Sequence, residues 1–465
     1  MKQSVGFLRL ALGIGLWFAL GCKPAYDPML PDSATLGNPR GKRIVRSIAH
    51  FHSPYSWDAC DRDGLSGGRL NPSCLAHLRA ALCMNRVDLL FLTDHPNAMH
   101  AYEMRELLLT SDQDHLVNQN GSPVVNQMSG CAGGFTPEIL VGFESQLMAL
   151  GMTAHLDPDP QVRKTLYDQD SLSLRTRLAN EAHAVVMIPH IESRSVEAME
   201  ALAPDGVEIY NFHANVDPKI RVSSLQAPPF QNIPGFLSFL VDPYGELNPD
   251  FSFLNFIEVF PVYLKKWDTL LSHGLRVAGF GGSDSHENVF PQVAQDGERL
   301  DSHRRIMRFM SNHLWVSTKE ADAIKQAMKA GQGWSVFEGL GSPLGMDFYA
   351  TLADSSWVGA GESGSLAGGV ARIRVKCPQL HPQSPRSGQS PRVRIVLKQI
   401  QPSGESVVVA QAQDQDLDWE ASSAGVFRAE LFIVPRHLKG FLGPFSGFSD
   451  QEFAWILTNP LYLES

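Results

Sequence analysis

Histidine and acidic residues recur in this sequence directly after short apolar runs. The first run ends in His50 and His52, which are two residues apart and therefore face the same way on an extended chain. Later runs end in further residues of the same chemistry, namely His95, Glu144, His190, Asp284 and His286. Imidazole and carboxylate groups are ligands for Zn, Mn and Fe. A single His-X-His pair is weak evidence for a metal site, but candidate ligands that follow several successive apolar runs predict one.

The apolar runs alternate with segments of helical periodicity, which is typical of repeated βα units around a parallel sheet. We predict strands at 44–49, 87–93, 138–143, 184–189, 206–210 and 275–281. Between them we predict helices that include 74–86, 172–182 and 262–273. In such folds the functional side chains gather at the carboxyl ends of the strands. The predicted elements would therefore bring the candidate ligands to one face.

Five short segments, in their order along the chain, resemble the metal motifs of the polymerase and histidinol phosphatase (PHP) superfamily: AHFHS, FLTDH, GFE, IPH and GSDSH. The resemblance covers residues 44–340 and implies an α/β fold, a distorted seven-stranded (β/α) barrel. It implies two to three divalent ions (Zn, Mn or Fe) and the ligands His50, His52, Asp58, His95, Glu144, His155, His190, Asp284 and His286. Asp63 remains an alternative to Asp58, because the register of the acidic segment 58–63 is open.

The resemblance also implies how the ligands are shared. One ion would be held by His50, His52, Glu144 and Asp284, a second by Glu144, His155 and His190, and a third by Asp58, His95 and His286. Two ions bridged by a carboxylate can lower the pKa of a shared water and supply a hydroxide nucleophile, which predicts hydrolysis. A third ion would hold a phosphoryl oxygen and favours small phosphate esters or diesters as substrates. Asp284, His190 and His286 are the catalytic candidates.

Four residues near these ligands have open roles. Arg194, four residues after His190, is a candidate for binding a substrate phosphate or an ordinary solvated arginine at a helix start. His213 follows the strand predicted at 206–210 and is a candidate pocket residue. We interpret Glu208, inside that strand, as structural. Asp94 either orients His95 or caps the end of its strand.

From about residue 341 the pattern changes to alternating apolar stretches at 371–376, 392–399, 406–412, 427–433 and 453–457. This alternation predicts a C-terminal all-β, sandwich-like module over 341–465. Two of its segments, FRAELF (427–432) and WILTNPLY (455–462), resemble the ending of the carbaryl hydrolase-like branch of PHP proteins. That branch includes hydrolases of carbamate and amide bonds. A carbamate, amide or ester hydrolase is therefore an alternative to a phosphoesterase, and a non-catalytic metal- or glycan-binding envelope lipoprotein is a third.

The N-terminus carries the pattern of an export signal. Lys2 and Arg9 precede an apolar run at 10–20, which is long enough for a signal peptide and too short to span a bilayer. The run ends in ALGC, which resembles the bacterial lipobox and implies lipidation of Cys22. We therefore predict a signal peptide at 1–21, a tether at 22–43 and a metallohydrolase domain at 44–340. Plain secretion or a periplasmic location is the alternative to a membrane-anchored lipoprotein in the cell envelope.

Charge and cysteine content limit the partners and the compartment. The formal net charge is -10 and there is no basic run, so we expect a small-molecule substrate and no nucleic acid. In an oxidising compartment Cys60, Cys74, Cys83 and Cys131 could form two disulfides and leave Cys377 free. The sequence does not give the pairing, and unpaired buried thiols are the alternative.

Overall fold

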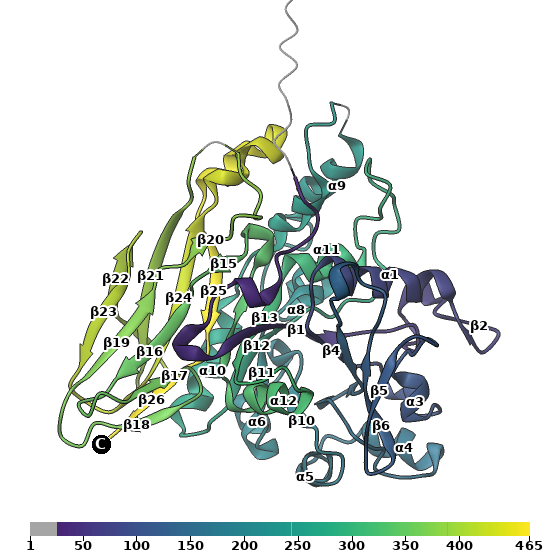
Figure 1. Ribbon diagram of the computed structural model, residues 1–465, viewed down its shortest axis with the longest axis horizontal. Helices are drawn as coiled ribbons and strands as arrows, with labels where there is room; N and C mark the ends of the chain where they lie inside the picture. The colour runs from purple at the N-terminus through teal and green to yellow at the C-terminus, as the bar shows by residue number, and fades with distance from the viewer. Residues whose placement is uncertain (1–25, 243, 388) are drawn as a thin grey trace, which may run out of the picture.

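The computed structural model describes residues 26–242, 244–387 and 389–465. The predicted signal peptide and Cys22 lie outside this part of the chain, so their predicted roles stay predictions. Among the described residues, no helix is long and apolar enough to cross a membrane. Figure 1 shows the α/β part of the chain on the right and a large twisted β-structure on the left.

Parallel strands form the first half of the α/β part. β1 (Arg43–Phe51) pairs in parallel with β4 (Leu89–Leu92), which pairs in parallel with β7 (Glu138–Leu140). Helix α1 (Pro72–Met84) connects β1 to β4. Nearly every residue of these strands is buried, as expected for parallel strands that are covered on both faces. Beyond β7 the sheet continues through the antiparallel strands β6 (Ser122–Gln127) and β5 (His115–Gln119).

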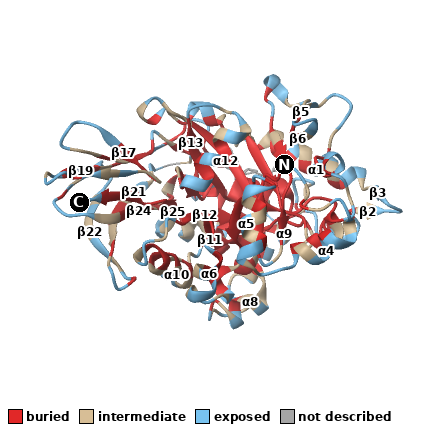
Figure 2. Ribbon diagram, turned by 90° about the horizontal axis from the view of Figure 1, so that it is seen from below, coloured by how far each residue is buried: buried red, intermediate tan, exposed pale blue. Residues whose placement is uncertain are grey.

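A second sheet forms the other half of the α/β part. Its order is β12 (Ala278–Gly282), β11 (Gly206–Asn211), β10 (Val185–Ile188), β9 (Met148–Leu150) and β8 (Phe143–Glu144). The first three strands are parallel, and β9 is antiparallel to both neighbours. Helices α6 (Val196–Leu202) and α10 (Pro261–Ser272) lie between the parallel strands, and α5 (Leu172–Asn180) lies between β9 and β10. Figure 2 shows the buried residues concentrated on the central strands β11, β12 and β13 (Ser311–Val316).

The two sheets meet where β1 lies beside β12. The backbone N–H of Ser283 donates to the carbonyl of Ala49 at 3.1 Å, and that of His52 donates to the carbonyl of Ser285 at 3.1 Å. The carboxyl ends of β1 and β12 are therefore adjacent, and predicted ligands lie at both ends. The α/β prediction is confirmed at this level. A single closed seven-stranded barrel stays a prediction, because the described strands divide between two sheets.

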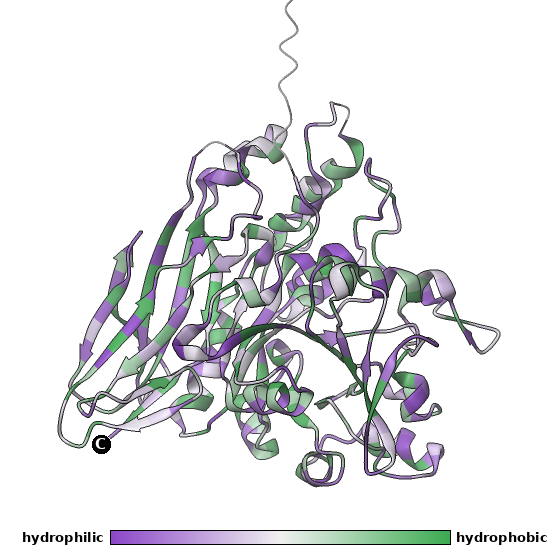
Figure 3. Cartoon of the chain, in the orientation of Figure 1, coloured by the Kyte–Doolittle hydropathy of each residue, from purple (hydrophilic) through white to green (hydrophobic). Residues whose placement is uncertain are grey.

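The C-terminal part is rich in β-strands, and the first sheet continues into it. β1 pairs antiparallel with β13, which pairs with β14 (Gly333–Val336), which pairs with β25 (Phe453–Thr458). The further strands of this sheet are β24 (Gly425–Val434), β21 (Arg392–Ile400), β22 (Ser406–Gln413), β26 (Leu461–Glu464) and β18 (Ser363–Ser365). Its hydrophilic and hydrophobic residues alternate along the strands (Figure 3), which is the pattern that predicted them.

A four-stranded sheet packs against these C-terminal strands. Its order is β17 (Trp357–Gly359), β16 (Asp347–Thr351), β19 (Ala371–Lys376) and β23 (Leu417–Ala421). Ile373 and Val375 of β19 belong to the same hydrophobic core as Ile395 of β21 and Leu431 of β24. Two sheets that share a core form a sandwich-like arrangement, as the alternating pattern predicted.

Four of the described cysteines form two disulfides. Cys60 pairs with Cys74 and Cys83 pairs with Cys131, and Cys377 is free. The number of bridges agrees with the prediction, and the structure supplies the pairing that the sequence left open. Both bridges attach α1 to neighbouring loops, because Cys74 and Cys83 lie on this helix.

The Cys83–Cys131 disulfide should stabilise the fold, because it closes a loop across 48 residues and limits the conformations of the unfolded chain. We expect replacement of both residues by Ser to lower the free energy of unfolding by about 2 to 4 kcal/mol. Urea denaturation followed by circular dichroism measures this change. Cys377→Ser is the matched control and should have little effect. Equal stabilities of the double variant and the control would contradict the prediction.

Candidate metal centre

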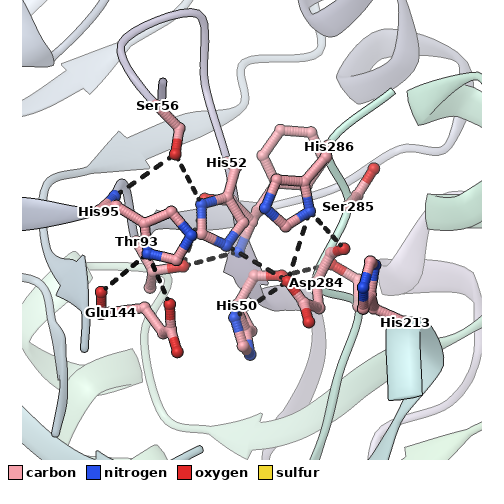
Figure 4. A network of polar contacts seen from close by, with 12 residues as sticks. His50, His52, Ser56, Thr93, His95, Glu144, His213, Asp284, Ser285 and His286 are labelled. Carbon is pink, nitrogen blue, oxygen red and sulfur yellow. Dashed lines mark hydrogen bonds and ion pairs between the residues drawn. The ribbon is translucent and has the colours of Figure 1, made fainter. Parts of the chain in front are cut away.

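The structure brings eight of the nine predicted ligands together at the ends of the parallel strands. They form three groups in which all ligand atoms lie within 4.8 Å of one another. The groups are His52, Asp58, His95 and His286; His50, Glu144 and His190; and His50, His52 and Asp284. Because His50 and His52 each belong to two groups, the three groups form one continuous cluster (Figure 4).

Asp284 lies at the centre of this cluster. One of its carboxylate oxygens, Oδ1, is 3.2 Å from His50 Nε2 and 3.3 Å from His52 Nε2, and Oδ2 is 3.3 Å from His190 Nε2. The two imidazole nitrogens of His50 and His52 are buried and have no hydrogen-bond partner in the described structure. Two ligands bound at about 2.1 Å to one tetrahedral ion lie about 3.4 Å apart. The spacing and the unsatisfied nitrogens therefore fit a shared metal ion.

Two further carboxylates lie between imidazoles in the same way. Asp58 Oδ2 is 3.3 Å from His95 Nε2 and 3.2 Å from His286 Nε2. Glu144 is 2.9 Å from His95 Nδ1 through Oε2 and 3.8 Å from His190 Nε2 through Oε1. A set of imidazoles and carboxylates suits Zn, Mn or Fe. The residues thus fit the divalent ions that the sequence motifs imply.

The structure distinguishes Asp58 from Asp63. Asp58 lies in the cluster, and its Oδ1 accepts a hydrogen bond from Ser56 Oγ at 2.9 Å. Asp63 is exposed and belongs to no group of candidate ligands among the described residues. Ser56 Oγ also lies 3.1 Å from His52 Nδ1, so one hydroxyl helps to orient two of the ligands.

His155 is a predicted ligand that the structure does not bring to the cluster. Its Nε2 is 3.0 Å from the carbonyl oxygen of Tyr102, to which it donates, and its Nδ1 is 3.0 Å from Tyr167 Oη. A neutral imidazole with both nitrogens occupied has no lone pair left for a metal. Burial and the charge of Arg163 lower the pKa of His155 to about 4, which keeps the ring neutral. In this structure His155 is therefore a structural residue.

The two predicted substrate residues have different surroundings. Arg194 binds Gln146 and Asp170: its Nη2 donates to Gln146 O at 2.7 Å, and its Nη1 lies 3.2 Å from Asp170 Oδ2. Its guanidinium is thus engaged by these two residues. His213 lies beside the cluster, with its ring centroid 5.7 Å from that of His286, and lines a small cavity with Asp284.

Glu208 has a positioning role that the sequence analysis missed. Its Oε1 accepts from His50 Nδ1 at 2.5 Å, and its Oε2 accepts from the backbone N–H of His190 at 2.9 Å. A carboxylate on the second nitrogen of a metal-binding histidine fixes the tautomer and the ring orientation. The signal in the sequence was an acidic residue inside an otherwise apolar strand. Our interpretation of Glu208 as merely structural was incomplete.

Two neighbouring positions support this arrangement. A Cβ on Gly282 would lie 1.9 Å from Glu208 Oε1, so only glycine leaves room for the carboxylate. Glu192 lies 3.2 Å from His190 Nδ1 and orients that ring, as Glu208 orients His50. Asp94 has a different role: it accepts hydrogen bonds from the N–H and hydroxyl of Ser53 at 2.6 and 2.7 Å. It therefore fixes the turn after β1, and in the described structure it makes no hydrogen bond to the ring of His95.

Three ligands have a left-handed backbone conformation. The φ angles are 57° at His50, 51° at His190 and 46° at Asp284. Such angles are uncommon for residues other than glycine, and each costs on the order of 1–3 kcal/mol unless local contacts compensate. All three residues lie at strand ends, where this turn aims the side chain toward the cluster. Strain concentrated at the ligands is typical of a functional site.

The charges of the cluster shift its pKa values strongly. Burial disfavours the charged ring of His50, but Asp284 and Glu208 outweigh burial and raise its pKa to about 10. At His95 burial is likewise outweighed by Asp58 and Glu144, which raise the pKa to about 11. Burial and the neighbouring His286 lower the pKa of His52 to about 3. Without a metal ion, the cluster therefore compensates its carboxylates by holding protons on some rings and excluding them from others.

Comparisons with known proteins give little further information. No protein-family model and no curated protein matches the sequence. One solved structure is similar: a two-domain protein from Bacteroides vulgatus ATCC 8482 that contains a predicted PHP-like metal-dependent phosphoesterase. The similarity covers 86% of this chain and 92% of that chain, with 10% sequence identity and a TM-score of 0.31. A similarity of this size does not establish a shared fold or function.

Glu208→Gln should weaken metal binding, because the amide cannot hold His50 Nδ1 as a carboxylate does. We expect the affinity for Zn²⁺ or Mn²⁺ to fall about 10- to 100-fold. Competition with a chromophoric chelator measures the affinity. Glu420→Gln, at an exposed residue of β23, is the control and should bind as the original chain does. Unchanged affinity in Glu208→Gln would remove Glu208 from the site.

Metal binding should release protons. In the metal-free site the rings of His50 and His95, with pKa values of about 10 and about 11, are protonated at neutral pH. A metal ion needs their lone pairs and must displace these protons. The affinity should therefore rise as the pH increases toward these values and fall in acid. Calorimetry in buffers of different ionisation enthalpy counts the protons, and an affinity independent of pH would contradict the assignment.

Proposed function

We propose that this chain is a metal-dependent hydrolase that uses two to three divalent ions and acts on small phosphate esters or diesters. One observation carries the proposal: the three adjoining groups of ligands share His50 and His52 and lie in a single cluster. Ions bound in such a cluster lower the pKa of water and compensate the charge that develops on the substrate. No serine or cysteine nucleophile is required.

The described residues around the cluster suggest how protons would move. In this proposal Asp284, His190 and His286 would be ligands of the metal ions at which the reaction takes place. Asp284 Oδ2 accepts the proton of the attacking water, and Asn211 Nδ2, 3.4 Å away, helps to hold this oxygen. Burial lowers the pKa of His213, so its ring is neutral at pH 7. The neutral ring of His213, whose Nε2 is 3.8 Å from Asp217, can then take over the proton that Asp284 accepted from water and pass it to the leaving group.

A second candidate function, hydrolysis of a carbamate, amide or ester, is suggested by the mostly apolar lining of the small cavity beside His286, which has a volume of about 20 Å³. Its apolar residues are Phe212, Val216, Phe253, Val289, Phe290 and Ile306, and no Lys or Arg lines it. Arg194, the residue proposed to bind a phosphate, is engaged by Gln146 and Asp170. Phosphate recognition would then depend on the ions alone, whereas a neutral substrate needs no cationic side chain.

The two disulfides support a location outside the reducing cytosol, because such bonds persist in oxidising compartments. We therefore propose export to the cell envelope, with a membrane anchor at a lipidated Cys22. Secretion or a periplasmic location without the anchor is the alternative. In either location the substrate would be a small molecule outside the cytoplasm.

The test is turnover by the metal-loaded protein of three substrates: bis-p-nitrophenyl phosphate, a p-nitrophenyl ester and a naphthyl carbamate. Preferential phosphate turnover supports the phosphoesterase, and preferential ester or carbamate turnover supports the second candidate. His50→Ala and Asp284→Ala should lower kcat/KM by about a hundredfold to a thousandfold or more while the circular dichroism spectrum stays unchanged.

His115→Ala is the matched control, because His115 is exposed on β5 and its Nδ1 contacts Gln127. Full activity of both site variants would refute the mechanism. Metal binding without turnover of any of the three substrates would favour the non-catalytic reading, a metal- or glycan-binding lipoprotein.

A further inference from the structure

The described part of the chain begins at a point that the fold holds in place. Tyr26 is its first residue, and the hydroxyl of Tyr26 donates a hydrogen bond to Asp250. The ring of Tyr26 packs against Phe251 and Phe441, with centroid distances of 5.7 and 5.8 Å. These contacts set the place on the folded domain from which the chain leads back toward Cys22.

This fixed point limits how far a lipid anchor can lie from the fold. Four residue steps separate Cys22 from Tyr26 in the sequence. An extended chain spans at most about 3.6 Å per residue, so four steps cover no more than about 14 Å. The inference rests on the anchor proposed above: if Cys22 is lipidated, the surface around Tyr26 must lie close to the membrane.

Helix α9 (Ile233–Val241) lies at the same end of the molecule as this point (Figure 1). Its Phe239 stacks on Phe445, with ring centroids 6.1 Å apart. Phe445 lies four residues after Phe441, whose ring contacts Tyr26. A membrane held close to Tyr26 would therefore also be close to α9.

The outer side of α9 and its flanks expose large apolar side chains. Leu237 and Val241, which lie one turn apart on one face of the helix, are 37% and 75% exposed. Phe230 before the helix and Tyr244 after it are 62% and 80% exposed. The stretch 222–241 contains no charged residue. Single exposed apolar residues are ordinary, but several on one uncharged segment indicate an interaction surface. We call Phe230, Leu237, Val241 and Tyr244 the apolar patch.

The charged residues next to the apolar patch do not oppose contact with lipid. Asp242, directly after α9, accepts hydrogen bonds from the N–H of Leu247 at 2.6 Å and from Gln295 Nε2 at 2.9 Å. Its carboxylate is thus engaged by the protein. The exposed residues Glu246 and Lys439 carry opposite charges. Insertion of apolar side chains, rather than attraction between charges, would therefore stabilise the contact.

We propose that the apolar patch docks on the phospholipid bilayer to which Cys22 is attached. The nine residues of α9 are about 14 Å long and cannot cross a hydrocarbon core of about 30 Å, so the helix would lie in the plane of the membrane surface. Tyrosine is enriched at this depth of a membrane, because its ring is apolar and its hydroxyl stays hydrated. The lipid and the patch together give two points of contact, which fix the orientation of the molecule.

The inner side of α9 connects the apolar patch to the candidate metal centre. The ring of Phe236 lies 4.5 Å from that of Phe290 and 5.4 Å from that of Phe253, measured between centroids. Phe253 and Phe290 line the small cavity beside His286. Docking through α9 would therefore hold the metal centre near the membrane surface, where it could meet substrates that are associated with the bilayer.

The test is a spin label that reports whether the apolar patch enters lipid. The chain, as the producing cell exports and processes it, is placed in vesicles of phosphatidylethanolamine and phosphatidylglycerol. A nitroxide is attached to Val241→Cys in a Cys377→Ser background, and electron paramagnetic resonance measures its collisions with oxygen and with a polar nickel chelate. Val408→Cys is the matched control, because Val408 is 49% exposed on β22 of the C-terminal part.

We expect the label at Val241→Cys to shift toward collisions with oxygen on vesicles, and the label at Val408→Cys to remain accessible to the nickel chelate. Leu237→Asp in the labelled chain should remove the shift, because it places a charge on the same face of α9. Equal accessibility at both positions in a chain whose Cys22 carries lipid, as shown by mass spectrometry, would overturn the docking surface and leave the anchor intact. Equal accessibility in a chain without this lipid would refute both.

A second copy of the chain is the other occupant to be tested. Protection of the label at Val241→Cys without vesicles, increasing with protein concentration, would mean that another copy covers the apolar patch and would overturn the proposal. The proposed hydrolysis is tested separately by turnover, so a failure of membrane docking leaves it intact.

Discussion

The buried carboxylate of Asp284 is the group on which the rest of this site depends. It faces the imidazoles of His50, His52 and His190 at 3.2 to 3.3 Å in a position from which water is almost excluded. A buried charge is stable only when it is paired, and removal of its partners is costly. Without a metal ion, that charge is balanced by protons on the rings of His50 and His190, whose pKa values are raised. Metal ions can take the place of these protons, so the geometry is prepared for them.

The position of Asp284 follows from the junction of the two sheets. The end of β12 lies against the end of β1, so that Asp284 and the His50–His52 pair are opposite each other. The C-terminal strands brace the same junction: Asn459 accepts from the N–H of Gly279 at 2.6 Å and donates to its carbonyl at 3.0 Å. The motif WILTNPLY (455–462) therefore has a structural role, because its Asn459 supports β12, the strand that precedes Asp284. The C-terminal strands thus help to hold β12 in place beside the site.

Much of this arrangement could be predicted from local sequence patterns. The strands and most ligands were found because apolar runs, their spacing and the residue types after them are local properties. His155 was predicted as a ligand, but in the structure its ring contacts Tyr102 and Tyr167, which sequence alone does not place beside it. Glu208 was underestimated because its partner His50 is 158 residues away. The disulfide pairing was open for the same reason, since it depends on which loops meet α1.

The position of His155 has a chemical consequence for the cluster. The resemblance implied that Glu144, His155 and His190 would share one ion, but His155 is bound to two tyrosines. The residues that could hold this ion in the structure are Glu144, His190 and His50. Sites with three protein ligands leave coordination positions for water and substrate, whereas closed sites with four are structural. An ion held by these three residues would thus keep coordination positions open for water or substrate.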